Sequence, residues 1–148
     1  MRARTLTLLL MIAVSLWGCA TTQEEVLVRT GSTSMTCTSL NCVVTVKVGP
    51  GCAISTNGDT LTVRVPDEKE VLVKWRIEFV SGGTGAFTAT GIDGKTGAWH
   101  SEFKQPTPGA TEFTWVNKNK QKNKPFGYNA FVAQGGVTCK YDPIIINN

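Results

Sequence analysis

A stretch near the middle of the chain, residues 71–80, most strongly constrains how this sequence can fold. Apolar and charged side chains alternate from residue 71 to residue 79, with Trp75 at the centre and Leu72 as the one exception. A period of two is typical of a β-strand with one buried face, whereas a helix would spread the same residues around its circumference. We therefore predict an all-β protein built around this strand. Its inward side chains would be Val71, Val73, Trp75, Ile77 and Phe79, and its outward ones Lys74, Arg76 and Glu78.

Turn-forming residues divide the rest of the chain into further short stretches with strand character. No run of ten residues after the first 18 has helical periodicity. About eight short strands with regularly spaced turns are typical of a β-sandwich or barrel. We predict an all-β, antiparallel β-sandwich of about eight strands with one or two disulfides. The expected strands, besides 71–80, are 43–48, 60–65, 86–90, 98–103, 111–116, 128–133, 137–141 and a final 144–146, with 26–28 as an edge strand.

The order Cys52, Trp75, Cys139 is compatible with an immunoglobulin-like architecture. In that fold a tyrosine stands two residues before the second cysteine. Here Val137 occupies that position, so the similarity extends to the architecture alone.

The first 18 residues have the features of an export signal. Arg2 and Arg4 provide a positive start, and residues 6–14 provide an apolar run that is short for a membrane span. The next residues, Leu-Trp-Gly-Cys at 16–19, resemble the lipobox of bacterial lipoproteins, in which a leucine stands three positions before the cysteine and a small residue directly before it. Trp17 departs from that pattern.

The resemblance to bacterial lipoproteins implies cleavage before Cys19 and acyl chains on this cysteine. Two or more acyl chains hold a protein stably on a membrane, because each buried methylene contributes about 0.8 kcal/mol. With Ala20 as the next residue, the resemblance implies the outer membrane of a Gram-negative envelope, on its periplasmic side. Ordinary cleavage after Ala20 is the alternative and would give a secreted or soluble periplasmic protein.

The expected organisation is a signal peptide at 1–18, a lipid-anchored flexible tether at 19–36 and a β-sandwich domain at 37–148. The tether is expected from its polar start and its small residues at 30–34.

Four cysteines remain after Cys19, an even number that permits two disulfides in an exported chain. None forms a Cys-x-x-Cys pair, and the chain has one histidine, so neither a structural zinc nor another cofactor is expected. Four cysteines allow three pairings. We favour a local Cys37–Cys42 bridge and a long-range Cys52–Cys139 bridge.

Composition indicates a globular chain, with 41% hydrophobic and 18% charged residues. The net charge is +4, and without the two arginines of the signal it falls to +2. This weak charge argues against nucleic acid as a partner, because nucleic-acid binding needs a concentrated basic face.

The segment 117–124, Asn-Lys-Asn-Lys-Gln-Lys-Asn-Lys, is the clearest candidate for a binding surface. It contains no acidic residue and is expected to form a cationic loop between two strands. It could contact an acidic protein or an anionic envelope polymer. The alternative is a solubilising hairpin that also blocks edge pairing. The candidate contact residues are Lys118, Lys120, Lys122 and Lys124.

Two more candidate contact residues are neighbours in the chain. Trp99 follows a glycine-rich stretch and is expected to be the most exposed tryptophan, whereas Trp75 and Trp115 are expected in the core. His100 is the only imidazole and is expected in an exposed loop, where no serine or cysteine has a spacing that requires it as a base.

The ending of the chain, residues 126–148, is similar to that of small secreted bacterial proteins. It has an aromatic strand, a cysteine, Asp-Pro and a terminal asparagine. This resemblance implies no particular activity.

Three hypotheses for the function follow. The first is a non-catalytic, envelope-anchored binding or structural module, because no complete catalytic constellation is visible. The second is a periplasmic inhibitor or immunity protein that blocks a toxin or secreted enzyme with its loops. The third is a small hydrolase that uses His100.

Overall fold

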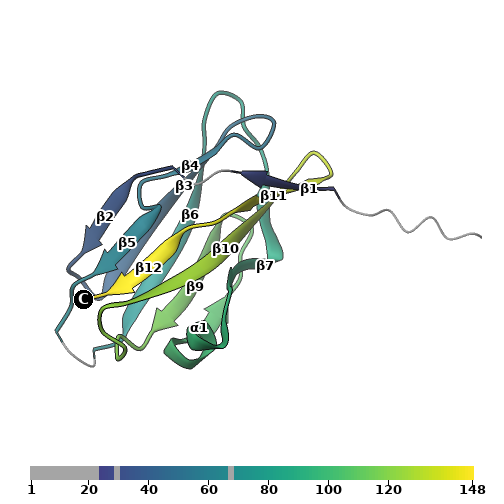
Figure 1. Ribbon diagram of the computed structural model, residues 1–148. Coiled ribbons are helices and arrows are strands. Elements are labelled where there is room, and N and C mark those ends of the chain that lie inside the picture. Colours follow the sequence, from purple (N-terminus) through teal and green to yellow (C-terminus); the bar gives the residue numbers. More distant parts are fainter. Residues whose placement is uncertain (1–23, 29–30, 67–68) are drawn as a thin grey trace, which may run out of the picture.

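In the computed structural model, two β-sheets pack face to face and enclose one core (Figure 1). The structure describes residues 24–28, 31–66 and 69–148. The predicted export signal and Cys19 therefore lie outside the described residues. Within the described part of the chain, no helix is long and apolar enough to cross a membrane.

The larger sheet has seven strands and the smaller has five. The larger contains β1 (Glu25–Val28), β2 (Ser34–Cys37), β5 (Thr60–Val63), β7 (Ala86–Gly94), β10 (Lys124–Gln134), β11 (Val137–Tyr141) and β12 (Ile144–Asn147). The smaller contains β3 (Asn41–Val48), β4 (Ile54–Thr56), β6 (Val71–Phe79), β8 (Phe103–Thr107) and β9 (Glu112–Asn117). A short helix, α1 (Gly97–Glu102), connects β7 to β8 and so passes from one sheet to the other. The β-sandwich prediction is confirmed.

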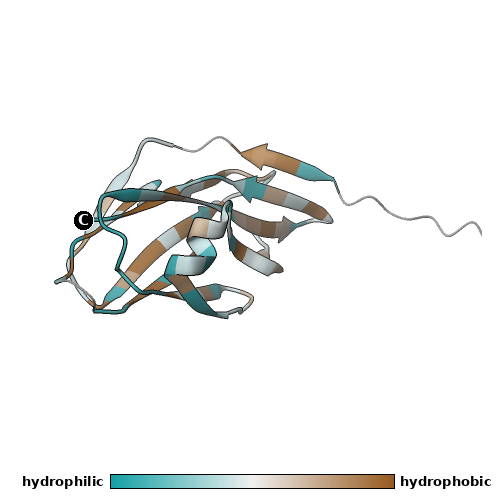
Figure 2. Ribbon diagram, turned by 60° about the horizontal axis from the view of Figure 1, so that its bottom comes forward, coloured by the Kyte–Doolittle hydropathy of each residue, from teal (hydrophilic) through white to brown (hydrophobic). Residues whose placement is uncertain are grey.

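Strand β6 lies at the centre of the smaller sheet, between β3 and β9. Its alternation works as predicted up to Ile77, with Trp75 completely buried and the charged side chains outside the core. Phe79 was predicted to point inward, but its exposed fraction is 44%. It is the last residue of β6, where the chain turns into the 80–85 loop, so its face of the strand is no longer covered. Figure 2 shows how hydrophobic and hydrophilic residues alternate along the strands of the sandwich.

A long hairpin organises the larger sheet. Gly135 and Gly136 both have positive φ angles, 57° and 84°, which suit a two-residue turn between antiparallel strands. Strands β11 and β12 then run along β10 in one continuous register. The break between them falls at Pro143, which has no N–H, although its carbonyl still accepts from the Tyr128 amide at 3.1 Å.

Four strand pairs among the described residues are parallel and six are antiparallel, so the antiparallel pairing predicted for the sandwich holds for most pairs and not for all. The parallel pairs are β1 with β11, β5 with β12, β2 with β5, and β3 with β6. Parallel neighbours arise because the chain crosses to the other sheet between the two strands of each pair. Sequence periodicity carries no information about such crossings.

Two further predictions need correction. The predicted strand 98–103 is mostly the helix α1, in which Trp99 and Glu102, three residues apart, face the interior. The predicted flexible tether, 19–36, contains β1 and most of β2, so ordered strands begin before residue 37. Strand β1 lies at an edge of the larger sheet, as expected for 26–28.

The two sheets are joined in the core by a polar contact between aromatic side chains. The indole Nε1 of Trp75, on β6, donates to the phenol oxygen of Tyr128, on β10, at 2.9 Å. Their rings meet edge to face with centroids 5.3 Å apart, a favourable geometry for aromatic pairs. Both side chains are fully buried. This contact fixes the position of the larger sheet over the centre of the smaller one.

Both disulfides also connect the two sheets. The bridges are Cys37–Cys42 and Cys52–Cys139, as predicted. Cys42 stands near the start of β3 and Cys52 shortly after its end. One bridge therefore lies near each end of this strand. Two buried disulfides indicate an oxidising compartment outside the cytoplasm.

Replacing both Cys52 and Cys139 by alanine is expected to lower the free energy of unfolding by about 4–5 kcal/mol, because the bridge closes a long loop. Replacing Cys37 and Cys42 should cost only about 2 kcal/mol, because that loop is short. Equilibrium denaturation in urea measures both. Equal losses for the two double variants would contradict this ranking.

Tyr128→Phe is expected to destabilise the protein by about 1–3 kcal/mol, because the buried indole N–H of Trp75 loses its acceptor. Burial raises the pKa of the Tyr128 phenol well above its usual value. Above about pH 10 the unfolded chain releases this proton while the folded chain keeps it, so stability falls as the pH rises. Denaturation between pH 8 and about pH 11 should show a steeper decline for the wild type than for Tyr128→Phe. Identical declines would show that Tyr128 ionises normally in the fold.

Candidate functional site

The lysine loop, residues 118–123, connects β9 to β10 at the end of the sandwich where α1 and the C-terminus lie (Figure 1). Asn117, which precedes the loop, and Asn119 within it are both fully buried, whereas Lys120 and Asn123 are exposed and Lys118 and Lys122 are half-buried. At positions 117–120 the alternation in the sequence therefore has a structural cause, since the two buried amides anchor the loop and Lys120 lies on its surface.

A buried carboxylate at the end of α1 holds this loop in place. Glu102 is 1% exposed, and its Oε1 accepts from the backbone N–H groups of Lys120 at 2.5 Å and Gln121 at 3.2 Å. The same oxygen accepts from the Asn147 side chain on β12 at 2.9 Å. One oxygen therefore ties the loop, the helix and the last strand together.

The asparagine side chains extend this network. Asn117 Nδ2 donates to Asn147 Oδ1 at 2.6 Å, and the Asn119 amide donates to Asn117 Oδ1 at 2.8 Å. Asn119 also donates from its side chain to the Val65 carbonyl at 3.3 Å. Asn119 and Asn123 have positive φ angles, 56° and 55°, a conformation that asparagine tolerates better than most residues. The predicted cationic loop is thus built as a fixed element of the fold.

The four lysines differ in how their ammonium groups are held. Lys118 Nζ donates to the Ser101 carbonyl at 2.6 Å, near the C-terminus of α1, where a cation is favourable. Lys122 Nζ contacts the carbonyls of Val65 and Asn148, both at 3.3 Å. Lys124 Nζ donates to Gln121 Oε1 at 2.9 Å. Lys118 and Lys122 therefore also support the loop, whereas Lys120 and Lys124 are the better candidates for contact with a partner.

Trp99 is not on the surface, contrary to the prediction. It is completely buried, and its ring stacks on Phe103 with centroids 3.8 Å apart. The ring also lies directly over Gly94, where a Cβ atom would come within 1.8 Å of it. Gly94 thus belongs to the packing of the core around Trp99. A ligand on the protein surface cannot contact this indole in the described conformation.

His100 is exposed, as predicted, but it lies on α1 and not in a loop. Its Nε2 is 3.8 Å from Asp93 Oδ1, and both side chains are about half exposed. This separation is longer than a hydrogen bond. The structure therefore brings His100 near one carboxylate, at the same end of the sandwich as the lysine loop.

Glu102 and Asn147 were not among the residues selected from the sequence, and Asn117 was included only as the first residue of the candidate segment, without a role of its own. The regular spacing of asparagines and lysines at 117–124 was a signal for two opposite faces. Nothing in the sequence paired Asn117 with an asparagine 30 positions later.

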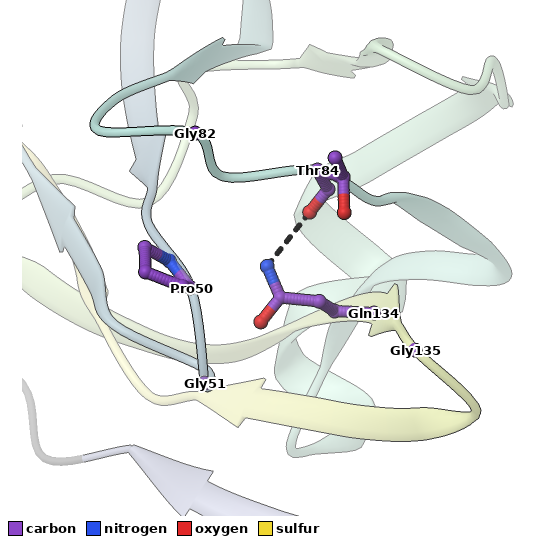
Figure 3. A pocket seen from close by; sticks show the side chains of 6 residues that line it. All are labelled: Pro50, Gly51, Gly82, Thr84, Gln134 and Gly135. Carbon is purple, nitrogen blue, oxygen red and sulfur yellow. Dashed lines mark hydrogen bonds between the residues drawn. The ribbon is translucent and has the colours of Figure 1, made fainter.

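The opposite end of the sandwich, here called the hairpin end, consists of the 49–53 and 80–85 loops and the turn at Gly135–Gly136. A shallow hollow of about 310 Å³ lies there, lined by Pro50, Gly51, Gly82, Thr84, Gln134 and Gly135 (Figure 3). Gln134 holds the loops together, since its Nε2 donates to the carbonyls of Gly49 and Thr84, both at 2.8 Å. Its Oε1 accepts from the Cys52 amide at 2.8 Å.

No group of three or more histidine, cysteine or acidic side chains within the described ranges is arranged to hold a metal ion. No protein-family model matches this chain, and no curated protein matches it.

Glu102→Ala is expected to release the lysine loop, because three donors would lose their common acceptor. The free energy of unfolding should fall by about 3 kcal/mol, and the Lys120 and Gln121 amides should lose protection against hydrogen exchange. Glu102→Gln keeps a carbonyl oxygen in the same place and is the matched control. Unchanged protection of both amides in Glu102→Ala would show that the loop is held by other contacts.

Proposed function

We propose that this protein is a non-catalytic binding module of the bacterial envelope, anchored through lipid on Cys19, which uses the lysine loop to bind an anionic partner. The partner is an acidic protein or an anionic polymer of the envelope. The observation that carries this proposal is the exposure of Lys120, on a loop whose backbone the buried Glu102 holds, next to Lys124 at the start of β10.

A fixed cationic surface is better suited to binding than a flexible one. Ordering a mobile loop on association costs conformational entropy, which lowers affinity. Here the hydrogen bonds of Glu102 and Asn117 order the loop in the free protein. A loop that served only solubility would need no such support from a buried carboxylate.

The proposed location rests on two independent features. The two disulfides place the folded chain in an oxidising compartment. The lipobox-like residues 16–19 supply the anchor, as they do in the lipoproteins that they resemble.

The test is affinity capture from an envelope extract with the full exported chain, comparing Lys120→Gln with Lys47→Gln. Lys120 and Lys47 are both exposed, but Lys47 is on β3, away from the loop. We expect Lys120→Gln to reduce the captured amount several-fold at low salt, and the double variant with Lys124→Gln to reduce it further. Lys47→Gln should leave it unchanged.

Equal capture by the wild type, the loop variants and Lys47→Gln would refute a role for the lysine loop. The captured material also separates the two partner classes. An acidic protein would be retained in a constant molar ratio, whereas a polymer would be retained as chains of many lengths.

A further inference from the structure

We infer that the hairpin end of the sandwich is a membrane-facing surface that rests against lipid headgroups around the anchor, with the lysine loop held at the far end. This inference rests on the proposed lipid anchor at Cys19. It adds which face of the domain meets the membrane and which face remains available to a partner.

The first observation is the length of chain between the anchor and the fold. Five residues separate Cys19 from Glu25, where β1 begins. Even a fully extended chain of this length spans only about 20 Å. The start of β1 therefore cannot lie farther than this from the membrane surface.

The second observation is where β1 begins. It pairs with β11 in parallel, with Glu25 opposite Thr138, only two residues beyond Gly136 of the hairpin turn. The carbonyl of Glu24 also accepts from the Thr138 amide at 2.9 Å. In Figure 1 the start of β1 lies beside the turn between β10 and β11. The short spacer thus brings the hairpin end toward the membrane.

The third observation is the distribution of charge. The loops 49–53 and 80–85 and the turn at 135–136 contain no acidic or basic residue. These loops can approach headgroups without the cost of removing water from ions. Charged side chains nearby include Glu24 and Glu25 at the start of β1, and Glu25 is paired with Lys140 at 3.1 Å. The opposite end carries the lysine loop and lies about 30 Å away, the length of the nine-residue strand β6.

The fourth observation is apolar surface at the hairpin end. A second hollow of about 350 Å³ lies there, with Val28, Pro50, Ala53 and Val80 among its walls. Phe79, at the end of β6, and Leu27, on β1, are 44% and 68% exposed. Exposed apolar surface next to a short lipid tether is suited to the interfacial region of a bilayer.

The test uses the full lipidated protein in vesicles of phosphatidylethanolamine and phosphatidylglycerol that contain a headgroup quencher. A fluorophore is attached to a single new cysteine, either Ala53→Cys at the hairpin end or Thr96→Cys at the opposite end. Both positions are exposed, and the Thr96 side chain makes no capping hydrogen bond. We expect at least twofold stronger quenching at position 53 than at position 96.

A flotation assay of the wild type and Cys19→Ala distinguishes failure of the anchor from failure of the orientation. If the wild type does not float with the vesicles, the lipid anchor and the inferred orientation are both refuted. If the wild type floats, Cys19→Ala does not, and positions 53 and 96 are quenched equally, the anchor stands and the orientation is refuted. Stronger quenching at position 96 would also refute it.

Discussion

The hydrogen bond between Trp75 and Tyr128 is the contact on which the arrangement of the two sheets depends. Each partner is buried on the central strand of its own layer, and each presents a polar group that needs a partner away from water. Sliding one sheet over the other by a single residue would leave both groups unpaired. Apolar packing alone tolerates such shifts more easily, because it has no direction.

At each end of the sandwich, one polar side chain makes several hydrogen bonds that hold the loops in place, an amide at one end and a carboxylate at the other. At the hairpin end, the side-chain amide of Gln134 joins the 49–53 and 80–85 loops through three backbone groups, and the Cys52–Cys139 bridge lies beside it. At the other end, the carboxylate of Glu102 accepts hydrogen bonds from two backbone amides and from an asparagine side chain. The loops at the hairpin end contain no charged residue, whereas the loop at the other end is rich in lysine, so the same scaffold presents two surfaces of different character.

Much of the fold was predictable from local pattern. The alternation along 71–80 identified the central strand, and the pairing favoured among the three possible ones for four cysteines is the one in the structure. The lysine loop was also placed correctly between two strands. The misses share one cause, which is that they depend on residues distant in the chain. Trp99 is buried because its ring also packs against Trp115 and Tyr128, and Glu102 is buried because Asn147 and the loop amides contact it. Helix α1 buries these two side chains, and its six residues are too few for a helical hydrophobic period to be recognised in the sequence.

The position of β12 gives the lysine loop a dependence on the very end of the chain. Asn147, the next-to-last residue, supplies donors to both Glu102 and Asn117, and β12 fills the space between β10 and β5. The lysine loop therefore reaches its described conformation only when β12 has docked between β10 and β5, so the pairing of this strand and the ordering of the cationic surface are coupled.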